Sequence, residues 1–209
     1  MSARIDHATT SGTFELDGGS WDVDNNVWVL GDDAECVIID APHDAAAIAE
    51  AVGDRQVRAI LLTHSHSDHV DAAFDLRERT GAPLHLHPAE APVWELTHPG
   101  RRWDEDLADG QSLQVAGVTL EVLHTPGHSP GACCFHVPEL GVLFSGDTLF
   151  QGGPGATGRS FSDFDVIVQS ITDRLLTLPE ETVVHTGHGD DTTIGAEKPH
   201  RQGWLDRGE

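Results

Sequence analysis

The 209-residue sequence predicts an α/β protein, and three observations lead to that class. Continuous apolar runs such as AILLT (59–63) and TVVHT (182–186) are typical of strands that are buried on both faces. Segments with helical periodicity, such as residues 45–52, alternate with these runs. The middle of the chain is richer in strand signals and turns. Because this length suits one large domain, we expect a single domain over residues 1–209.

The first predicted elements are two paired strands and a helix. NVWVL (26–30) and CVIIDAP (36–42) are separated by a short acidic turn, so we expect the two strands to pair. Asp44 is a favourable N-cap for a helix over residues 45–52. Gly53 follows that helix and suits its C-terminal end.

A second helix and a short strand are expected after the buried strand 59–63. Val70, Ala73 and Phe74 have the spacing of one helical face. TGAP (80–83) contains the residues that end helices, so the helix should stop there. LHLHP (84–88) then reads as a strand.

The second half of the chain predicts two hairpins, a loop and a further helix–strand pair. The hairpins cover residues 113–125 and 132–150. Residues 151–160 contain four glycines and a proline, which predicts a loop. Residues 164–178 have helical periodicity up to Pro179, and strand 182–186 and a short tail complete the chain.

The composition excludes some classes of partner. The chain has 35 acidic and 12 basic residues and a formal net charge of −23, which disfavours binding to nucleic acid or to anionic lipid. We find no run of eighteen apolar residues and no apolar signal region near residue 1, so no membrane association and a cytoplasmic location are expected. The sequence gives no indication of the oligomeric state.

The stretch LLTHSHSDHV (61–70) is the strongest functional signal. It places His64, His66, Asp68 and His69 directly behind a buried strand. Imidazole and carboxylate are ligands for zinc and similar divalent metals. A single histidine at a strand end is usually a structural polar group, but four such side chains within six residues indicate metal binding.

Three further ligand-type residues occur later in the chain, and each follows an apolar strand. They are His128 in VLHTPGH, Asp147 in VLFSGD and His188 in VVHTGH. The carboxyl ends of strands are where α/β proteins tend to build their sites. These three residues are therefore candidates to complete a site with the histidine-rich stretch.

The HxHxDH pattern followed by a histidine, an aspartate and a histidine resembles the metallo-β-lactamase superfamily of metallohydrolases. The resemblance extends roughly over residues 26–194 and implies an αββα sandwich of two mixed sheets with helices outside. It implies seven ligands for two metal ions: His64, His66 and His128 for the first, Asp68, His69 and His188 for the second, and Asp147 for both. Asp40, at the end of VIID, would support the histidine-rich loop from behind.

The implied chemistry is hydrolysis by a metal-bridging hydroxide. Zinc is the expected metal, although iron and manganese also suit such ligands. Bound metal lowers the pKa of water to about 7 and polarises the carbonyl under attack. Asp68 is also a candidate to orient the attacking group. No serine or cysteine stands in a recognisable nucleophile motif.

The segments around residues 125–159 and 187–198 resemble the glyoxalase-II-like branch, whose members hydrolyse thioesters of small thiols. We therefore expect a small-molecule thioester such as an S-acylglutathione or S-acylmycothiol. The sequence departs from that branch by lacking its longer C-terminal helical region, so the thiol carrier or its binding should differ. Arg159 and Lys198 are the candidate contacts to substrate carboxylates, and a surface ion pair is an equally good explanation of Arg159.

Three alternatives remain open from the sequence. An iron-dependent persulfide dioxygenase has a similar sequence but uses one metal, whereas both metal positions are filled here. A β-lactam hydrolase is a second alternative, and a non-catalytic metal-binding module is the third. The absence of cysteine among the seven candidate ligands argues against a closed structural zinc site.

Overall fold

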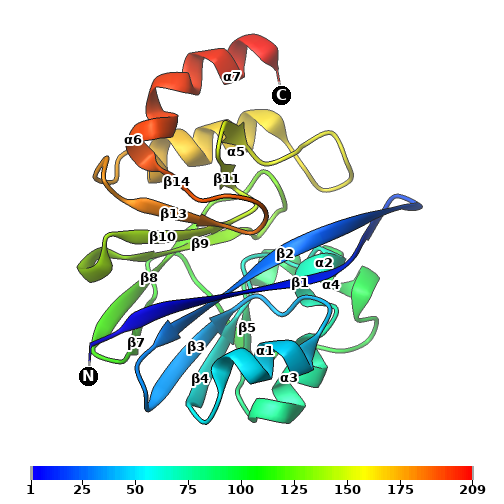
Figure 1. Cartoon of the computed structure of the whole chain (residues 1–209). Coiled ribbons are helices and arrows are strands. Elements are labelled where there is room, and N and C mark those ends of the chain that lie inside the picture. Colours follow the sequence, from blue (N-terminus) through cyan, green and yellow to red (C-terminus); the bar gives the residue numbers. More distant parts are fainter. Residues whose placement is uncertain (1, 209) are drawn as a thin grey trace.

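The computed structural model describes residues 2–208, which form two mixed six-stranded sheets that pack face to face (Figure 1). The first sheet has the order β1-β2-β3-β4-β5-β6. Its strands are β1 (Arg4–Leu16), β2 (Gly19–Gly31), β3 (Glu35–Ile39), β4 (Gln56–Leu61), β5 (Leu84–Leu86) and β6 (Glu105–Asp106). Strands β3 to β6 are parallel, whereas β1, β2 and β3 are linked by antiparallel pairing.

The second sheet has the order β14-β13-β10-β9-β8-β7. Its strands are β7 (Ser112–Val115), β8 (Val118–His124), β9 (Cys133–Val137), β10 (Val142–Gly146), β13 (Val183–Thr186) and β14 (Thr192–Thr193). Strands β11 (Leu149–Phe150) and β12 (Gly153–Pro154), each of two residues, pair with each other and form a separate small sheet. Within the second sheet β10 and β13 are parallel, so their carboxyl ends meet at one edge.

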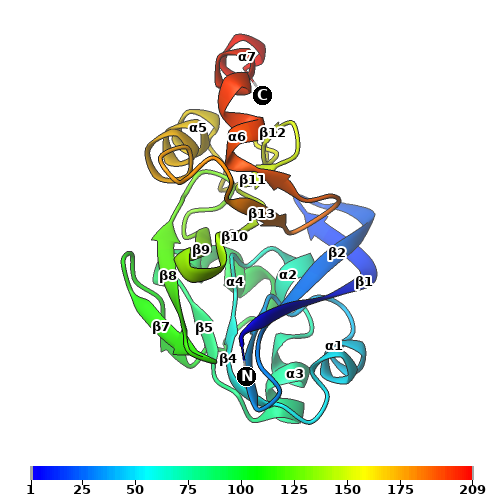
Figure 2. The same cartoon turned by 60° about the vertical axis from the view of Figure 1, so that its left-hand side comes forward.

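Helices cover the outer face of each sheet (Figures 1 and 2). Four lie with the first sheet: α1 (Ala45–Val52), α2 (Ser67–Val70), α3 (Ala73–Thr80) and α4 (Ala91–Thr97). Three lie with the second sheet: α5 (Phe164–Ser170), α6 (Ile194–Glu197) and α7 (Arg201–Arg207). The four-layer αββα sandwich is therefore confirmed.

The strand residues divide into three apolar cores because alternate side chains point to opposite faces of a sheet. In β3, Cys36 and Ile38 join the core beneath α1 and α3, whereas Val37 and Ile39 face the second sheet. The third core lies between the second sheet and its helices and includes Trp204 of α7, which is completely buried. Sheets buried on both faces explain the continuous apolar runs in the sequence.

Several predicted elements are found with their predicted bounds. Helix α1 has Asp44 as its N-cap, and the Asp44 carboxylate accepts hydrogen bonds from two backbone amides of the first turn. Gly53 follows the helix with a φ of 65°, where glycine avoids the steric cost of a side chain. Both predicted hairpins of the second half are also present, as β7–β8 and β9–β10.

One prediction was wrong in detail, and one segment had no predicted structure. The single helix expected around Val70 and Phe74 is split into α2 and α3, because the N–H of Ala72 donates to Ala41 O rather than continuing the helical pattern. The tail after residue 194 is helical, since α6 and α7 cover the second sheet and bury Trp204.

An N-terminal hairpin is the main element that the sequence analysis left unassigned. Strands β1 and β2 pair over their whole lengths around the two-residue turn Asp17–Gly18, whose positive φ values suit a tight hairpin. Only the last part of β2, from Trp28, pairs with β3. The free part of the hairpin therefore projects beyond the first sheet, as the blue ribbon in Figure 1 shows.

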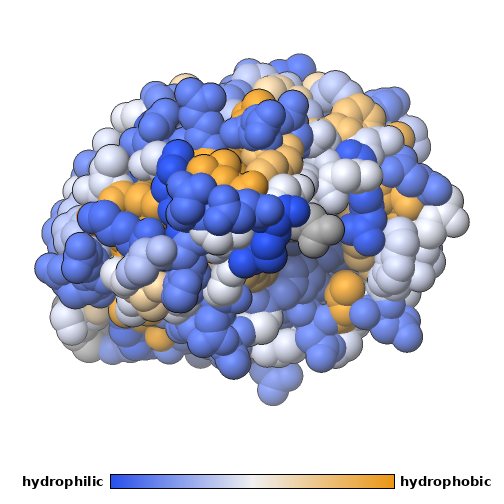
Figure 3. Space-filling model, turned by 90° about the horizontal axis from the view of Figure 1, so that it is seen from above, coloured by the Kyte–Doolittle hydropathy of each residue, from blue (hydrophilic) through white to orange (hydrophobic). Residues whose placement is uncertain are grey.

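The surface agrees with the acidic composition. On the side of the molecule where α6 and α7 lie, the surface is mostly hydrophilic, with apolar residues in separate patches (Figure 3). None of the helices within residues 2–208 is both long and apolar enough to cross a membrane.

Candidate metal centre

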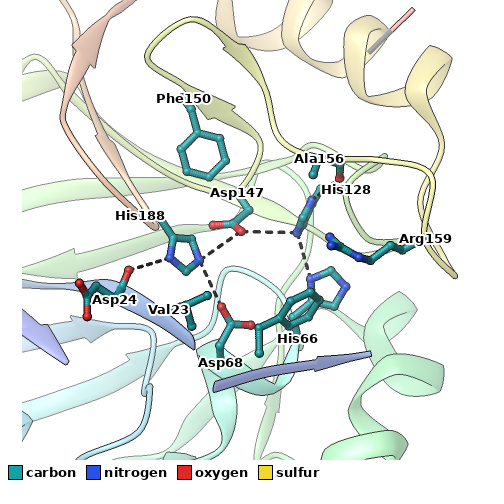
Figure 4. Close-up of a pocket in the computed structure, with 11 residues that line it drawn as sticks. Val23, Asp24, His66, Asp68, His128, Asp147, Phe150, Ala156, Arg159 and His188 are labelled. Carbon is teal, nitrogen blue, oxygen red and sulfur yellow. Dashed lines mark hydrogen bonds and ion pairs between the residues drawn. The ribbon is translucent and has the colours of Figure 1, made fainter. Parts of the chain in front are cut away.

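All seven predicted ligand-type side chains meet at one edge of the sandwich, and Figure 4 shows five of them around a pocket. They come from loops and a short helix at the ends of strands. After β4 lie His64 and His66, and α2 carries Asp68 and His69; His128 lies between β8 and β9, Asp147 follows β10, and His188 follows β13. Residues from position 64 to position 188 of the sequence thus meet because both sheets end at this edge.

The first group consists of His64, His66 and His128. The Nδ1 atom of His66 lies 3.1 Å from His64 Nε2 and 3.0 Å from His128 Nε2. All three side chains are buried, and their ligand atoms lie within 4.8 Å of one another. Three ring nitrogens that converge in this way are suited to one metal ion with an open fourth position.

The second group consists of Asp68, His69 and His188. His188 Nε2 lies 3.2 Å from Asp68 Oδ2 and 3.3 Å from His69 Nε2. Asp147 lies between the two groups, with Oδ1 3.3 Å from His69 Nε2 and Oδ2 3.6 Å from His128 Nε2. Its carboxylate is therefore in reach of both groups, as a bridging ligand requires.

The orientation of the imidazoles supports metal binding more strongly than their proximity does. His128 Nδ1 donates to Ala156 O at 2.9 Å, and His188 Nδ1 donates to Asp24 O at 2.7 Å. In a neutral imidazole, a ring nitrogen that holds a proton for a carbonyl leaves the other ring nitrogen with a free lone pair. In both residues that free nitrogen is Nε2, which points into the site.

Asp40 fixes the same tautomer in two more histidines. Its Oδ2 accepts hydrogen bonds from His69 Nδ1 at 2.9 Å and from Thr63 Oγ1 at 2.8 Å, and its Oδ1 accepts from Thr63 N at 2.7 Å. Because the Thr63 hydroxyl proton is directed to Asp40, its oxygen accepts from His64 Nδ1, 3.0 Å away. Asp40 thus lies behind the histidine-rich loop, where we expected it, and leaves both Nε2 atoms free for metal.

His66 is the exception, because its Nδ1 rather than its Nε2 faces the other ligands. Its Nε2 is turned away from them. Asp147 Oδ1 is buried in the site and has no hydrogen-bond partner within residues 2–208. Burying an unpaired polar atom is costly, so this oxygen indicates that protein contacts alone do not satisfy the site. Imidazole and carboxylate donors of this kind fit a pair of divalent ions, and the cluster suits a dinuclear metal site.

The electrostatics also favour a cation. Burial raises the pKa of the Asp147 carboxyl, but His188 and His69 outweigh burial and hold that pKa well below its usual range. Burial lowers the pKa of His188, yet Asp147 and Asp68 raise it to about 10. Burial also lowers the pKa of His66 to about 3, so its ring is neutral and able to bind metal. Positive charge is therefore favoured between the carboxylates.

Gly187 allows the β13 loop to come close to the centre. A Cβ atom at this position would lie 2.2 Å from Asp147 Oδ1 and 2.9 Å from His69 Cε1. Any side chain here would push Asp147 or His69 out of place. Glycine is thus required at position 187 because the backbone there lies close to Asp147 and His69.

A cavity of about 410 Å³ opens onto the metal groups. Its size is in the range of small-molecule sites. Its walls combine ligands from both groups with apolar side chains from the N-terminal hairpin and from β11 (Figure 4). The lining residues are Phe14, Val23, Asp24, His66, Asp68, His128, Asp147, Phe150, Ala156, Arg159 and His188.

Of the two predicted substrate contacts, the structure places Arg159 at this cavity. Its guanidinium carbon lies 4.4 Å from the ring centre of Trp21 and 5.4 Å from that of Phe14, which are favourable cation–π distances. Lys198 is absent from the residues that line the cavity and lies 3.5 Å from Glu180 instead. The structure therefore gives no support to a substrate contact by Lys198.

Other histidines that resemble ligand pairs lie outside the two groups. His87 stacks on His124 at 4.1 Å between ring centres, and His185 Nδ1 contacts Asp191 at 2.9 Å. His136 lies 3.8 Å from Glu121. These contacts involve none of the seven ligand-type residues and are those of structural polar groups.

The sequence analysis missed the residues that surround the ligands. Phe14 and Trp21 come from the unassigned hairpin, and Asn25 lies on β2 beside the second group. Glu90 is completely buried and accepts hydrogen bonds from Ser65 N and Gly131 N, which ties the two ligand loops together. The Asp17–Gly18 pair between alternating segments was an available hairpin signal, whereas nothing in the sequence distinguishes Asn25 or Glu90.

The fold and the two ligand groups define a metallohydrolase-type protein of the αββα class. The family model described as metallo-beta-lactamase superfamily matches residues 21–188. The chain therefore belongs to the metallo-β-lactamase superfamily, and the sequence-based assignment to this family is confirmed.

Relatives and solved structures agree with this assignment. The chain is 34% identical over 188 residues to the hydroxyacylglutathione hydrolase GloC of Haemophilus influenzae, covering 81% of this chain and 87% of that protein. It is similar to the crystal structure of the BLEG-1 B3 metallo-β-lactamase, with 35% identity, a TM-score of 0.77 and coverage of 92% and 98%. It is also similar to TTHA1623 in a di-iron-bound form, with 35% identity, a TM-score of 0.73 and coverage of 84% and 93%.

Proposed function

We propose that this protein is a metal-dependent hydrolase that cleaves thioesters of a small thiol, such as S-acylglutathione or S-acylmycothiol. The observation that supports it most is the set of four imidazoles whose Nδ1 atoms face acceptors, so that their Nε2 atoms point toward two shared centres. The thioester class is supported by similarity to a hydroxyacylglutathione hydrolase over most of both chains. It also agrees with the resemblance of residues 125–159 to the glyoxalase-II-like branch.

The proposal gives each side chain a role. His64, His66 and His128 would hold one divalent ion, Asp68, His69 and His188 would hold the second, and Asp147 is within reach of both groups. Bound metal supplies a lowered pKa for water and polarises the thioester carbonyl. Zinc is the metal we propose, and iron is the strongest alternative, since a similar structure contains two irons.

Asp68 is proposed to orient the attacking water as well as to bind metal. It is buried but lines the cavity, so its carboxylate is within reach of a bound substrate. Burial raises the pKa of Asp68, but His69 and His188 outweigh burial and lower it, which keeps the carboxylate ionised as an acceptor. Phe14 and Phe150 give the cavity an apolar wall.

Arg159 is proposed to bind a carboxylate of the thiol carrier. The side chain lies at the rim of the cavity and is held over Trp21 and Phe14. A guanidinium can donate two parallel hydrogen bonds to a carboxylate. This arrangement places a positive charge at the cavity of a strongly acidic protein.

A β-lactam hydrolase is the second candidate. The similarity to the BLEG-1 B3 metallo-β-lactamase, at 35% identity over 92% of this chain, favours it. Both reactions attack a carbonyl carbon, so the metal groups do not distinguish between them. The leaving group does: a thiolate leaves in one reaction and a ring nitrogen in the other.

The test is elemental analysis of the purified protein together with a substrate panel. The panel contains S-lactoylglutathione, S-formyl conjugates and the β-lactam nitrocefin. We expect two divalent ions per chain and the highest kcat/KM with a thioester. Turnover of nitrocefin alone would replace the thioester proposal with the β-lactam one. Oxygen uptake by a protein with one iron per chain would favour a persulfide dioxygenase.

A further inference from the structure

We propose that Asn25 is a positioning residue for the second metal group, held by a hydrogen-bond chain through His43 to Asp71. This inference rests on the proposed metal function. Asn25 lies on β2 and is completely buried. None of the three residues belongs to the seven proposed metal ligands.

The Asn25 carboxamide faces all three ligands of the second group. Its Nδ2 lies 3.2 Å from Asp68 Oδ2, 3.3 Å from His69 Nε2 and 3.4 Å from His188 Nε2. Within residues 2–208, it makes no hydrogen bond to the three histidines of the first group. A side chain with such selective contacts can affect one metal site without the other.

Asp68 and His43 together set which end of the amide faces the ligands, because Asp68 Oδ2 only accepts hydrogen bonds. His43 Nε2 lies 2.9 Å from Asn25 Oδ1, and a carbonyl oxygen can only accept, so the ring nitrogen donates. The Asn25 amide nitrogen is therefore turned toward Asp68 and donates to its Oδ2. The opposite amide orientation would place two oxygens against each other, which is unfavourable.

Asp71 holds His43 from the other side. Its Oδ1 accepts from the backbone N–H of His43 at 2.6 Å, and its Oδ2 lies 3.1 Å from His43 Nδ1. His43 has a φ of 57°, in the left-handed region, so its backbone needs such support. The hydrogen-bond chain thus runs from Asp71, at the C-terminal end of α2, through the β3–α1 loop to β2 and back to Asp68 on α2.

Gly12 on β1 makes room for this arrangement. A Cβ atom on Gly12 would lie 2.2 Å from His43 Nδ1 and 2.4 Å from His43 Cγ. An alanine at this position would displace the His43 ring without touching any proposed ligand. Gly12→Ala is therefore a remote probe of the chain.

The experiment measures zinc binding to metal-free protein by competition with a chelator, without substrate. We expect Asn25→Ala to lower the affinity of the second site for zinc by about 10–100-fold, as is typical of residues that hydrogen-bond to metal ligands. The zinc affinity of the first site should stay within about threefold of the wild-type value. His43→Leu and Gly12→Ala should weaken the second zinc by about tenfold. His43→Gln keeps an N–H that can donate to Asn25 and should restore most of the loss.

The controls separate this inference from a structural effect and from the proposed function. Thr13→Ala, on the exposed face of β1 next to Gly12, should bind both ions as the wild type does. Equal weakening of both ions, or an unchanged second ion in Asn25→Ala, would overturn the positioning role while the proposed function stands. A wild-type chain that binds no zinc, iron or manganese would refute the proposed function itself. Thermal unfolding of each metal-free variant checks that the fold is retained.

Discussion

The metal groups and the outer wall of the cavity differ in how they are built. The ligands lie in short loops and a helix at strand ends and are mostly buried. Their imidazoles are fixed by hydrogen bonds that they donate to Asp40 and to backbone carbonyls. The outer wall is formed by a projecting hairpin and a glycine-rich loop, which meet through Arg159 and the Asp17–Ser160 hydrogen bonds. We infer that the ligand groups determine the class of chemistry and that the wall determines the substrate.

The largest effect should follow loss of a ligand. His66→Ala and Asp147→Ala should each lower the metal affinity by more than the 10–100-fold typical of residues that contact only a ligand. Hydrolysis should become undetectable in both variants. The fold should survive, because the three apolar cores do not include either side chain. Elemental analysis, far-UV circular dichroism and a thioester assay measure these effects. Unchanged rates in both variants would refute the mechanism.

Gly187→Ala should have the next largest effect. The added methyl group would overlap Asp147 Oδ1, so either the carboxylate or the loop must move. We expect a loss of bound metal together with destabilisation of about 1–3 kcal/mol from overpacking. Chemical denaturation and metal analysis test this. Gly189→Ala, where no atom lies within 4 Å of an added Cβ, is a control for backbone effects alone in this loop.

Asp40→Asn tests how much the hydrogen bonds that Asp40 accepts from Thr63 and His69 contribute to metal affinity. The substitution replaces one acceptor oxygen of Asp40 by a donor, which would face the donors of Thr63 or His69. We expect a 10–100-fold loss of metal affinity. Zinc competition measures it, and wild-type affinity in this variant would show that the histidine orientation does not depend on Asp40.

Arg159→Ala tests the outer wall separately from the metal groups. If Arg159 only holds the thiol carrier, KM should rise about tenfold with little change in kcat and no change in bound metal. Lys198→Ala is the matched control, because Lys198 lies beside Glu180 and should leave KM unchanged. A fall in kcat with unchanged KM would assign Arg159 to the chemical step instead.

The smallest effect on KM should follow loss of the contact between Asp17 of the β1–β2 hairpin and Ser160 of the glycine-rich loop. Hydrogen bonds from Ser160 lower the pKa of the exposed Asp17 carboxyl. A carboxyl with a lowered pKa in the folded state stabilises the contact at neutral pH and loses that stabilisation as the pH falls through the folded-state pKa. KM should therefore rise slightly at acidic pH in the wild type, and Asp17→Asn should show the higher KM at neutral pH too. Equal KM profiles for the two proteins would contradict this link.

The sequence predicted the ligand side of this comparison much better than the wall. His64, His66, Asp68 and His69 follow one buried strand, so their proximity is local and readable from spacing. The distant ligands also follow apolar strands, and the parallel pairing of β10 and β13 brings Asp147 and His188 to one edge. Family resemblance then supplied the partition into two groups.

The wall depends on contacts that sequence spacing does not encode. Phe14 reaches the cavity, and Trp21 contacts Arg159, only because the β1–β2 hairpin projects beyond its sheet. Asn25 is one of two adjacent asparagines on β2, and its role is visible only from its distances to the second group. Lys198 was a candidate because of its position in a shared motif, yet the fold places it on a short helix beside Glu180.

The most direct test of the central claim is the number of divalent ions bound per chain after saturation and dialysis. The measurement is made on the wild type, His66→Ala and Asp147→Ala in parallel. We predict two ions in the wild type and a clear loss in both variants. A wild-type chain that retains none, or variants that retain the full wild-type content, would contradict a dinuclear site built from these residues.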